Sequence, residues 1–175
     1  MQPEKLRLFF ALPCAPAMAE RIDRWRARQH FVGHLTPRAN LHLTLAFLGH
    51  LPAEQLTMLE RIPTGLALAE LACELHLDNL ACWRGGLLHL APSRAPANLL
   101  RLARELELAL VAAGLPSDRR PFRPHLTLAR GSRPPIASEP ADFAWQADEL
   151  VLYQSLQGRY LPLRCWPLGD KAAGG

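Results

Sequence analysis

The chain has 175 residues, a length that fits one compact domain. Hydrophobic residues make up 49% of it and charged residues 21%, a balance that supports a folded core and excludes a disordered chain. The formal net charge of +4 is compatible with an anionic partner, but it is too small for a protein that coats long duplex DNA.

The cysteines and the apolar runs indicate the compartment. The uninterrupted apolar run over residues 8–12 ends at Pro13 after five residues, short of the roughly 7–15 residues that the hydrophobic region of a signal peptide needs. No run approaches the ~18 apolar residues of a membrane-spanning helix. We therefore expect a cytoplasmic monomer that does not enter a membrane, with its four scattered cysteines in the reduced state: Cys14, Cys73, Cys82 and Cys165.

Predicted strands and helices alternate along the first half of the chain. The pattern of apolar residues, together with the prolines that open helices, predicts a strand over residues 6–12 and a helix from Pro16 to about residue 30. A strand over residues 41–48, ended by Gly49, precedes a helix over residues 52–62. Period-two alternation then predicts one strand over residues 71–80.

The second half continues in the same irregular order. After a turn at Gly85-Gly86 we expect a strand over residues 87–91 and a helix over residues 96–113, ended by Gly114. A loop rich in Pro and Arg, residues 116–124, leads to a strand over 125–130. Residues 149–154 and 160–166 form a predicted hairpin. Because the strands and helices follow no strict βαβ rhythm, the fold class is α+β.

A four-residue motif occurs twice in similar surroundings. His42-Leu43-Thr44-Leu45 and His125-Leu126-Thr127-Leu128 are 83 residues apart (125 − 42), and each follows a predicted strand and helix. Side chains alternate between the two faces of a strand. His and Thr of each motif therefore share one face, with Ala46 beside the first pair, whereas the leucines and Phe47 face a core. This pattern predicts an internal duplication with a pseudo-two-fold axis and both His-x-Thr faces lining one cleft.

Two histidines facing each other can perform acid–base chemistry. Histidine titrates near neutral pH, so one ring can act as a neutral base while the other acts as a protonated acid. The hydroxyls of Thr44 and Thr127 can donate hydrogen bonds to an anion held between the rings. This set of groups suits in-line displacement at phosphorus.

Longer stretches of the sequence resemble a known family. The chain is similar to the two-histidine phosphoesterase superfamily, in particular to its RNA 2′,3′-cyclic phosphodiesterase branch, historically called 2′-5′ RNA ligase. The resemblance covers essentially the whole chain and lies in residues 6–12, 40–49, 120–130, 153–155 and 158–160.

The resemblance implies a fold, a reaction and roles for residues. The fold would be a single bilobal domain over residues 1–175, with two antiparallel sheets flanking a central cleft, helices outside, and a flexible tail over residues 170–175. The reaction would be hydrolysis of an RNA 2′,3′-cyclic phosphate end to a 2′-phosphomonoester, without a metal or other cofactor. His42 would donate a proton to the leaving oxygen and His125 would accept one from water, while Thr44 and Thr127 would hold phosphoryl oxygens.

Further residues are candidates for binding the RNA substrate, which could include tRNA fragments. Arg130 and Arg123 lie close to the second motif and suit phosphate contacts. Phe122 and Phe9 are candidates for stacking on a base, whereas Trp145 fits a core better. The other five histidines have no partner motif.

Three other functions remain open on the sequence. A 2′-5′ RNA ligase would use the same histidines with a 5′-hydroxyl in place of water. A phosphodiesterase of small cyclic nucleotides would need no contacts to the body of an RNA. A non-catalytic RNA-binding module would have no use for the acid–base pair.

Overall fold

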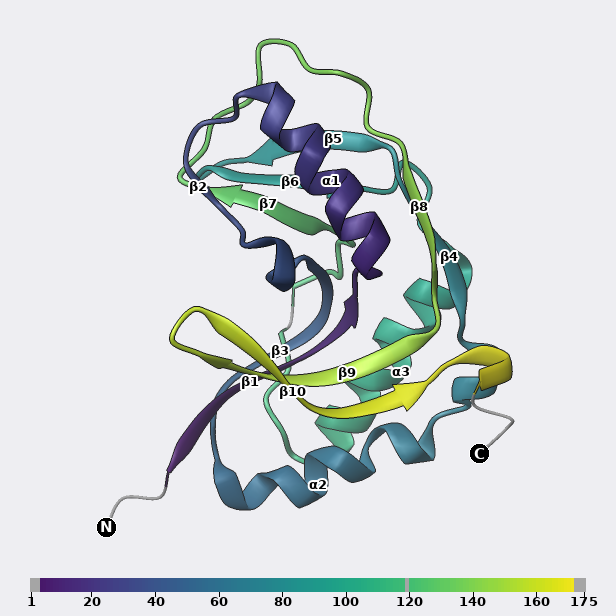
Figure 1. Ribbon diagram of the computed structural model, residues 1–175. Helices are drawn as coiled ribbons and strands as arrows, with labels where there is room; N and C mark the ends of the chain where they lie inside the picture. Colours follow the sequence, from purple (N-terminus) through teal and green to yellow (C-terminus); the bar gives the residue numbers. More distant parts are fainter. Residues whose placement is uncertain (1–3, 119, 172–175) are drawn as a thin grey trace.

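The computed structural model describes residues 4–118 and 120–171 and shows an α+β fold with antiparallel strand pairing (Figure 1). The strands are β1 Lys5–Pro13, β2 His34–Leu35, β3 His42–Pro52, β4 Cys73–Leu77, β5 Asn79–Trp83, β6 Leu87–Ala91, β7 Leu126–Arg130, β8 Phe143–Ala147, β9 Glu149–Leu156 and β10 Arg159–Pro167. The helices are α1 Pro16–Gln29, α2 Leu56–Arg61 and α3 Ala97–Ala112. No helix of the described residues is long and apolar enough to cross a membrane.

The main sheet consists of two halves joined at a single residue pair. One half has the order β10-β9-β1-β3, and the other contains β7, β6 and β5, with β2 on the edge of β7. The halves meet where Leu43 of β3 pairs with Leu126 of β7. Strands β4 and β8 form a separate antiparallel ribbon. The two antiparallel sheets that the resemblance implies are thus two halves of one sheet, and the repeated motifs lie at their join.

Each long helix covers the half-sheet that contains the other copy of the motif. Helix α1 follows β1 but lies over β5, β6 and β7 (Figure 1). There the buried Arg26 donates from Nη1 to the Leu128 carbonyl at 3.2 Å, and Asp23 accepts from Arg26 Nη2 at 2.7 Å. Helix α3 follows β6 but packs against β3. This exchange buries one apolar face of each helix: Met18, Ala19, Ile22 and Trp25 of α1, and Leu99, Leu102, Ala103, Leu106 and Leu110 of α3.

Two bulges change which side chains of β3 face the core. The register of β1 against β3 shifts twice, which leaves Leu48 and Leu45 as extra residues in β3. Phe47 is consequently 45% exposed on the motif face, whereas Ala46 packs against the core. The simple alternation predicted the opposite for both residues and is wrong there, because each bulge shifts the phase by one residue.

Several predicted boundaries are also wrong. Strand β3 continues past Gly49, whose φ of +72° fits the irregular register at that point. The predicted strand 71–80 is two strands, β4 and β5, in different sheets. The predicted helix 52–62 begins as a 3-10 turn, Ala53–Gln55, before α2. Strand β8 was not predicted from the sequence.

The C-terminal hairpin follows its prediction more closely. Gln157 and Gly158 connect β9 to β10 with φ values of 49° and 77°, the pair of positive values that a tight hairpin turn requires. Of the predicted flexible tail, Asp170 and Lys171 belong to a 3-10 turn, Gly169–Lys171, and residues 172–175 lie outside the described residues.

Candidate active site

The first motif holds its histidine in one tautomer. His42 begins β3, and its Nδ1 lies 2.6 Å from the carbonyl oxygen of Asn40. Because a carbonyl can only accept, Nδ1 carries the hydrogen. The other ring nitrogen, Nε2, lies 2.7 Å from Thr44 Oγ1. In the neutral ring Nε2 is therefore an acceptor, and the threonine hydroxyl donates to it.

Asn40 anchors this segment to the C-terminal hairpin. It is buried, and its Nδ2 donates to the carbonyl oxygen of Gly158 at 2.8 Å. The turn between β9 and β10 therefore helps to fix the backbone carbonyl that orients His42.

The second motif repeats the first arrangement. His125 immediately precedes β7, and its Nδ1 donates to the carbonyl oxygen of Arg123 at 2.8 Å. In both motifs the ring is held by the carbonyl two residues earlier in the chain. Nε2 of each histidine is left as the atom that can take up or release a proton.

The strand register brings the two motifs together. Continuing the Leu43–Leu126 pair by one residue in each direction places His42 opposite Thr127 and Thr44 opposite His125. The leucines of the pair are fully buried, so the histidines and threonines occupy the other face. The predicted juxtaposition of the four residues thus follows from one antiparallel pair.

The surroundings of His42 are aromatic. The ring of His42 lies 5.1 Å from Phe9, 5.1 Å from Tyr160 and 6.5 Å from Tyr153, measured between centroids. Burial lowers the pKa of His42, and repulsion from His125 and Arg130 lowers it further, against the opposing effect of the Asn40 hydrogen bond. His42 therefore favours the neutral form in the free protein.

The surroundings of His125 differ, since a third histidine lies nearby. Trp83 packs edge-on against His125 at 4.6 Å, and the buried His89 lies 5.6 Å from His125. Burial lowers the pKa of His125, and His89 and Arg130 contribute repulsion. The sequence analysis missed His89, because an isolated histidine in an apolar strand carries no motif. Its pairing with Thr127 across β6 and β7 becomes visible only in the structure.

The other predicted binding residues differ in their exposure and in their contacts with the two motifs. Arg130 ends β7 and is exposed, and its positive charge lowers the pKa of both His42 and His125. Arg123 is exposed and contributes its carbonyl to His125. Phe122 packs partly against the core. Phe9 is only 3% exposed and packs against the ring of His42, and Trp145 is buried in the core.

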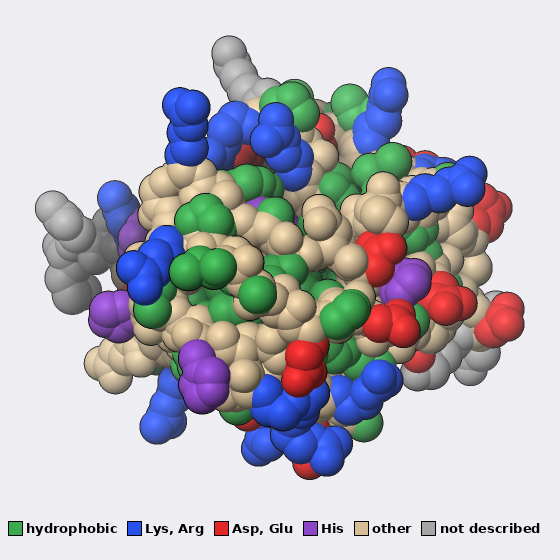
Figure 2. Space-filling model, turned by 90° about the horizontal axis from the view of Figure 1, so that it is seen from above, with side chains coloured by type: hydrophobic (Ala, Val, Ile, Leu, Met, Phe, Trp, Pro, Cys, Tyr) green, Lys and Arg blue, Asp and Glu red, His purple; other side chains and the backbone are tan. Residues whose placement is uncertain are grey.

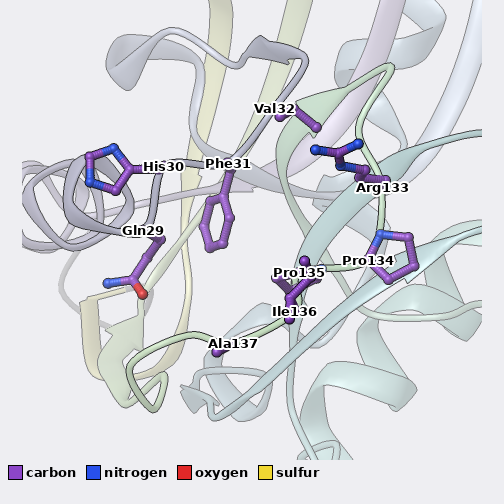
Figure 3. A pocket seen from close by; sticks show the side chains of 9 residues that line it. All are labelled: Gln29, His30, Phe31, Val32, Arg133, Pro134, Pro135, Ile136 and Ala137. Carbon is purple, nitrogen blue, oxygen red and sulfur yellow. The ribbon is translucent and has the colours of Figure 1, made fainter.

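Two hollows of the molecule lie away from the histidine pair. One, of about 190 Å³, separates residues 29–32 at the end of α1 from residues 133–137 after β7, with Phe31 and Ile136 on its two sides (Figure 3). The other, of about 400 Å³, lies between residues 63–70 and the end of β10. Within residues 4–118 and 120–171, no group of three His, Cys, Asp or Glu side chains could hold a metal ion.

The described geometry suits two-sided proton transfer at an anion. It also agrees with a family model: the model of the 2′-5′ RNA ligase superfamily matches residues 14–159, which include both motifs. The chain belongs to the 2′-5′ RNA ligase superfamily.

Relatives within the 2′-5′ RNA ligase superfamily match between about two thirds and nearly all of the chain. The RNA 2′,3′-cyclic phosphodiesterase of Escherichia coli K12 is 34% identical, over 94% of this chain and 98% of the relative. The RNA 2′,3′-cyclic phosphodiesterase of Thermus thermophilus is 33% identical, over 68% of this chain and 65% of the relative.

Solved structures give the same picture for the fold. A crystal structure of E. coli LigT complexed with 3′-AMP superimposes with a TM-score of 0.85 at 32% identity, over 94% of this chain and 99% of LigT. A crystal structure of E. coli LigT complexed with phosphate gives a TM-score of 0.83 at 31% identity, over 95% of this chain and 99% of LigT. The α+β fold with antiparallel sheets is thus that of the superfamily.

Proposed function

We propose that this chain is an RNA 2′,3′-cyclic phosphodiesterase that hydrolyses the cyclic end to a 2′-phosphomonoester. The observation that carries the proposal is the pairing of two His-x-Thr motifs at the join of the half-sheets, with Nδ1 of each histidine held by a carbonyl. The E. coli relative named for this activity, which aligns over nearly the whole chain, supports the same reaction.

The reaction runs through the two Nε2 atoms. His125 Nε2 takes a proton from water as the water oxygen forms a bond to phosphorus. The bond between phosphorus and O3′ breaks, and protonated His42 gives its Nε2 proton to O3′, which leaves the phosphate on O2′. Water thus adds across one P–O bond, and each histidine changes its protonation state once.

The remaining side chains hold the anion. Thr44 and Thr127 donate hydroxyl hydrogen bonds to the non-bridging oxygens, where negative charge increases in the transition state. Arg130 adds a positive charge beside both rings. The negative charge of the bound phosphate opposes the effects that lower the pKa of His42, so substrate binding favours the protonated acid.

The proposal extends to groups that contact RNA beyond the reacting phosphate. Arg123 is exposed next to the second motif and suits a backbone phosphate. Phe122 offers a half-buried ring for stacking, and Phe9 supports the nucleoside indirectly through the ring of His42. The lysines and arginines on the face shown in Figure 2 are spread around its margin, as suits a protein that binds one RNA end rather than coating a duplex.

Finer features of the proposal concern the state of the protein and its substrates. We propose a cytoplasmic monomer that acts as one bilobal domain, uses no metal or cofactor, and includes tRNA fragments among its substrates. The free thiols of Cys14, Cys73, Cys82 and Cys165 support a reducing compartment. The superfamily description also favours a second reaction, 2′-5′ ligation, in which a 5′-hydroxyl replaces the attacking water.

The decisive experiment is an end-point assay with a short RNA that carries a 2′,3′-cyclic phosphate. We expect a product with a terminal phosphomonoester. Phosphatase should remove this phosphate, and chromatography should show that it is attached to O2′. Two parallel assays test the alternative functions. Free 2′,3′-cyclic CMP tests for hydrolysis of small cyclic nucleotides, and addition of an RNA with a 5′-hydroxyl tests for ligation. An RNA end left intact by the wild type, or full activity in both His42→Ala and His125→Ala, would reject the proposal.

A further inference from the structure

The face of the sheet that carries His42 continues into an exposed row of side chains. In β1, Phe9 and Arg7 point to the same face because they are two residues apart. Phe9 pairs with Phe47 of β3 and with Tyr153 of β9. Arg7 occupies the next row, about 7 Å further along the strand, opposite His50.

Arg7 is held in place on this face by two neighbours. Its guanidinium carbon lies 5.0 Å from the centroid of the Phe47 ring, a cation–π distance. Its Nη1 lies 3.4 Å from Ser155 Oγ in β9 and donates to it. Arg7 and Phe47 are both exposed, so the remaining N–H groups of the guanidinium stay available to a ligand.

The exposure of Phe47 on this face results from the bulges in β3. Without them the ring would lie on the core side, and Arg7 would have no aromatic support. Lys5 lies one row beyond Arg7 on the same face of β1 and is also exposed. Among the described side chains of these rows, Lys5, Arg7, His50, Phe47 and Ser155, none is acidic. The row therefore presents positive charge at a regular spacing.

The row is continuous with the proposed site. Phe9 contacts His42 and stacks on Tyr153 at 5.3 Å, so aromatic rings fill the space between His42 and Arg7. The step from Phe9 to Arg7 along β1 is about 7 Å, and the ring of His42 lies a further 5.1 Å from the ring of Phe9. A phosphate beside His42 and a second phosphate beside Arg7 would thus belong to one RNA chain, with more than one nucleotide step between them.

We infer that Arg7, supported by Phe47 and Ser155, binds a phosphodiester further upstream (5′) in the RNA strand that carries the cyclic end, and so selects RNA ends over free cyclic mononucleotides. This inference rests on the proposed function. Arginine suits the role, because its planar N–H groups match a phosphate and its position is already fixed by the ring and the hydroxyl.

The experiment compares a substrate that carries upstream phosphodiesters with one that has none. The probes are a trinucleotide with a 2′,3′-cyclic phosphate end and 2′,3′-cyclic CMP, and the readout is the ratio of their kcat/KM values. We expect a wild-type ratio well above one. Arg7→Gln should lower the ratio roughly tenfold through loss of a charged contact. Phe47→Ala should lower it by about threefold through loss of the cation–π support.

A matched control variant is available on α1. The Arg21 guanidinium lies 6.0 Å from the Phe143 ring, so Arg21→Gln removes another arginine–aromatic pair of the same charge, and it should leave the ratio unchanged. Raising the salt concentration should weaken trinucleotide turnover more steeply in the wild type than in Arg7→Gln.

The outcomes separate this inference from the proposed function. If the wild type hydrolyses neither the trinucleotide nor cyclic CMP, the proposed function is overturned. Hydrolysis of both probes with equal kcat/KM, or an Arg7→Gln variant with the wild-type ratio, overturns the inference alone. An Arg7→Gln variant that slows both probes by the same factor assigns Arg7 to the stability of the sheet and also overturns the inference.

Discussion

The Nε2 atom of His42 and the Oγ1 atom of Thr44 lie 2.7 Å apart, so the two polar groups of the first motif already bind each other. While His42 is neutral, the threonine hydroxyl donates to it. When His42 becomes protonated beside a phosphate, the hydroxyl is free to turn toward a phosphoryl oxygen. Protonation of the acid and recruitment of the anion donor are therefore coupled through one hydrogen bond.

Removal of either threonine hydroxyl should slow the reaction while the fold is kept. We expect Thr44→Val and Thr127→Val each to lower kcat by roughly 10²–10³-fold, the usual effect of losing one donor to developing charge. Thr44→Ser should retain most activity. Thr64→Val, which removes an exposed hydroxyl that bonds the Arg61 carbonyl, is the control and should match the wild type. Wild-type rates in both Thr44→Val and Thr127→Val would contradict the role of the threonines as hydrogen-bond donors to the phosphoryl oxygens.

The two histidines should respond differently to a better leaving group. A nitrophenolate ester departs without a proton, so the general acid becomes dispensable while the general base does not. We expect His42→Ala to regain much of its lost activity on such an ester and His125→Ala to stay impaired. Recovery in His125→Ala instead would reverse the assigned roles. Equal recovery in both variants would mean that neither histidine acts as a dedicated general base.

The pH dependence should lie on the acid side of the ordinary histidine range. In the free enzyme kcat/KM falls at low pH as the base gains a proton, and it falls at high pH as the acid loses one. Since the pKa values of His42 and His125 are both lowered, both limbs and the optimum should lie below about pH 6.5.

A charge variant tests the cause of this displacement. Arg130→Gln removes a positive charge that lowers the pKa values of both histidines, so both limbs of the pH profile should move to higher pH. The maximal kcat/KM should also fall, because a phosphate contact is lost. Limbs that stay in place in this variant would show that Arg130 does not act on the pair.

The fold could be predicted from the sequence where periodicity is unbroken. Helix α3 and the β9–β10 hairpin follow their predictions within a few residues. The break between β4 and β5 is invisible in the alternating pattern. There the Asp78 carboxylate accepts from the backbone N–H and the hydroxyl of Ser93, a contact between residues 15 positions apart.

The site could be predicted where a motif repeats. His42, Thr44, His125 and Thr127 are recognisable because the same four-residue word occurs twice. The aromatic rings around His42 come from three separate strands, and His89 comes from a fourth. Phe9 is a stacking candidate from the sequence, but no local pattern places it, the tyrosines or His89 beside the motif histidines, since only the strand register and its bulges bring them together.

Activity should not depend on a metal ion. The proposed steps use side-chain acids, bases and hydrogen-bond donors alone. We expect kcat/KM in excess chelator to equal that in untreated enzyme, measured on the cyclic-ended trinucleotide. Loss of activity that added zinc or manganese restores would overturn the mechanism.

Gly33 should be intolerant of a side chain. Its φ is +100°, and an added Cβ would lie 2.5 Å from the carbonyl oxygen of Arg130. Gly33→Ala should therefore destabilise the fold by roughly 1–3 kcal/mol, measured as a lower Tm. The control is Gly65→Ala, because an added Cβ there meets nothing within 4 Å, and its Tm should stay close to the wild-type value.

The exchange of α1 and α3 between the half-sheets has a consequence for how the protein can be divided. A cut near Gly65 would leave one fragment with α1 but without the β5-β6-β7 half-sheet that α1 covers, and the other with α3 but without β3. Neither fragment can bury its helix alone, so we expect each to stay unfolded by itself and the mixture to fold as a complex. A single copy of the repeat would face the same constraint. It could complete its core only by associating with a second copy, and the shared site would then take one histidine from each subunit.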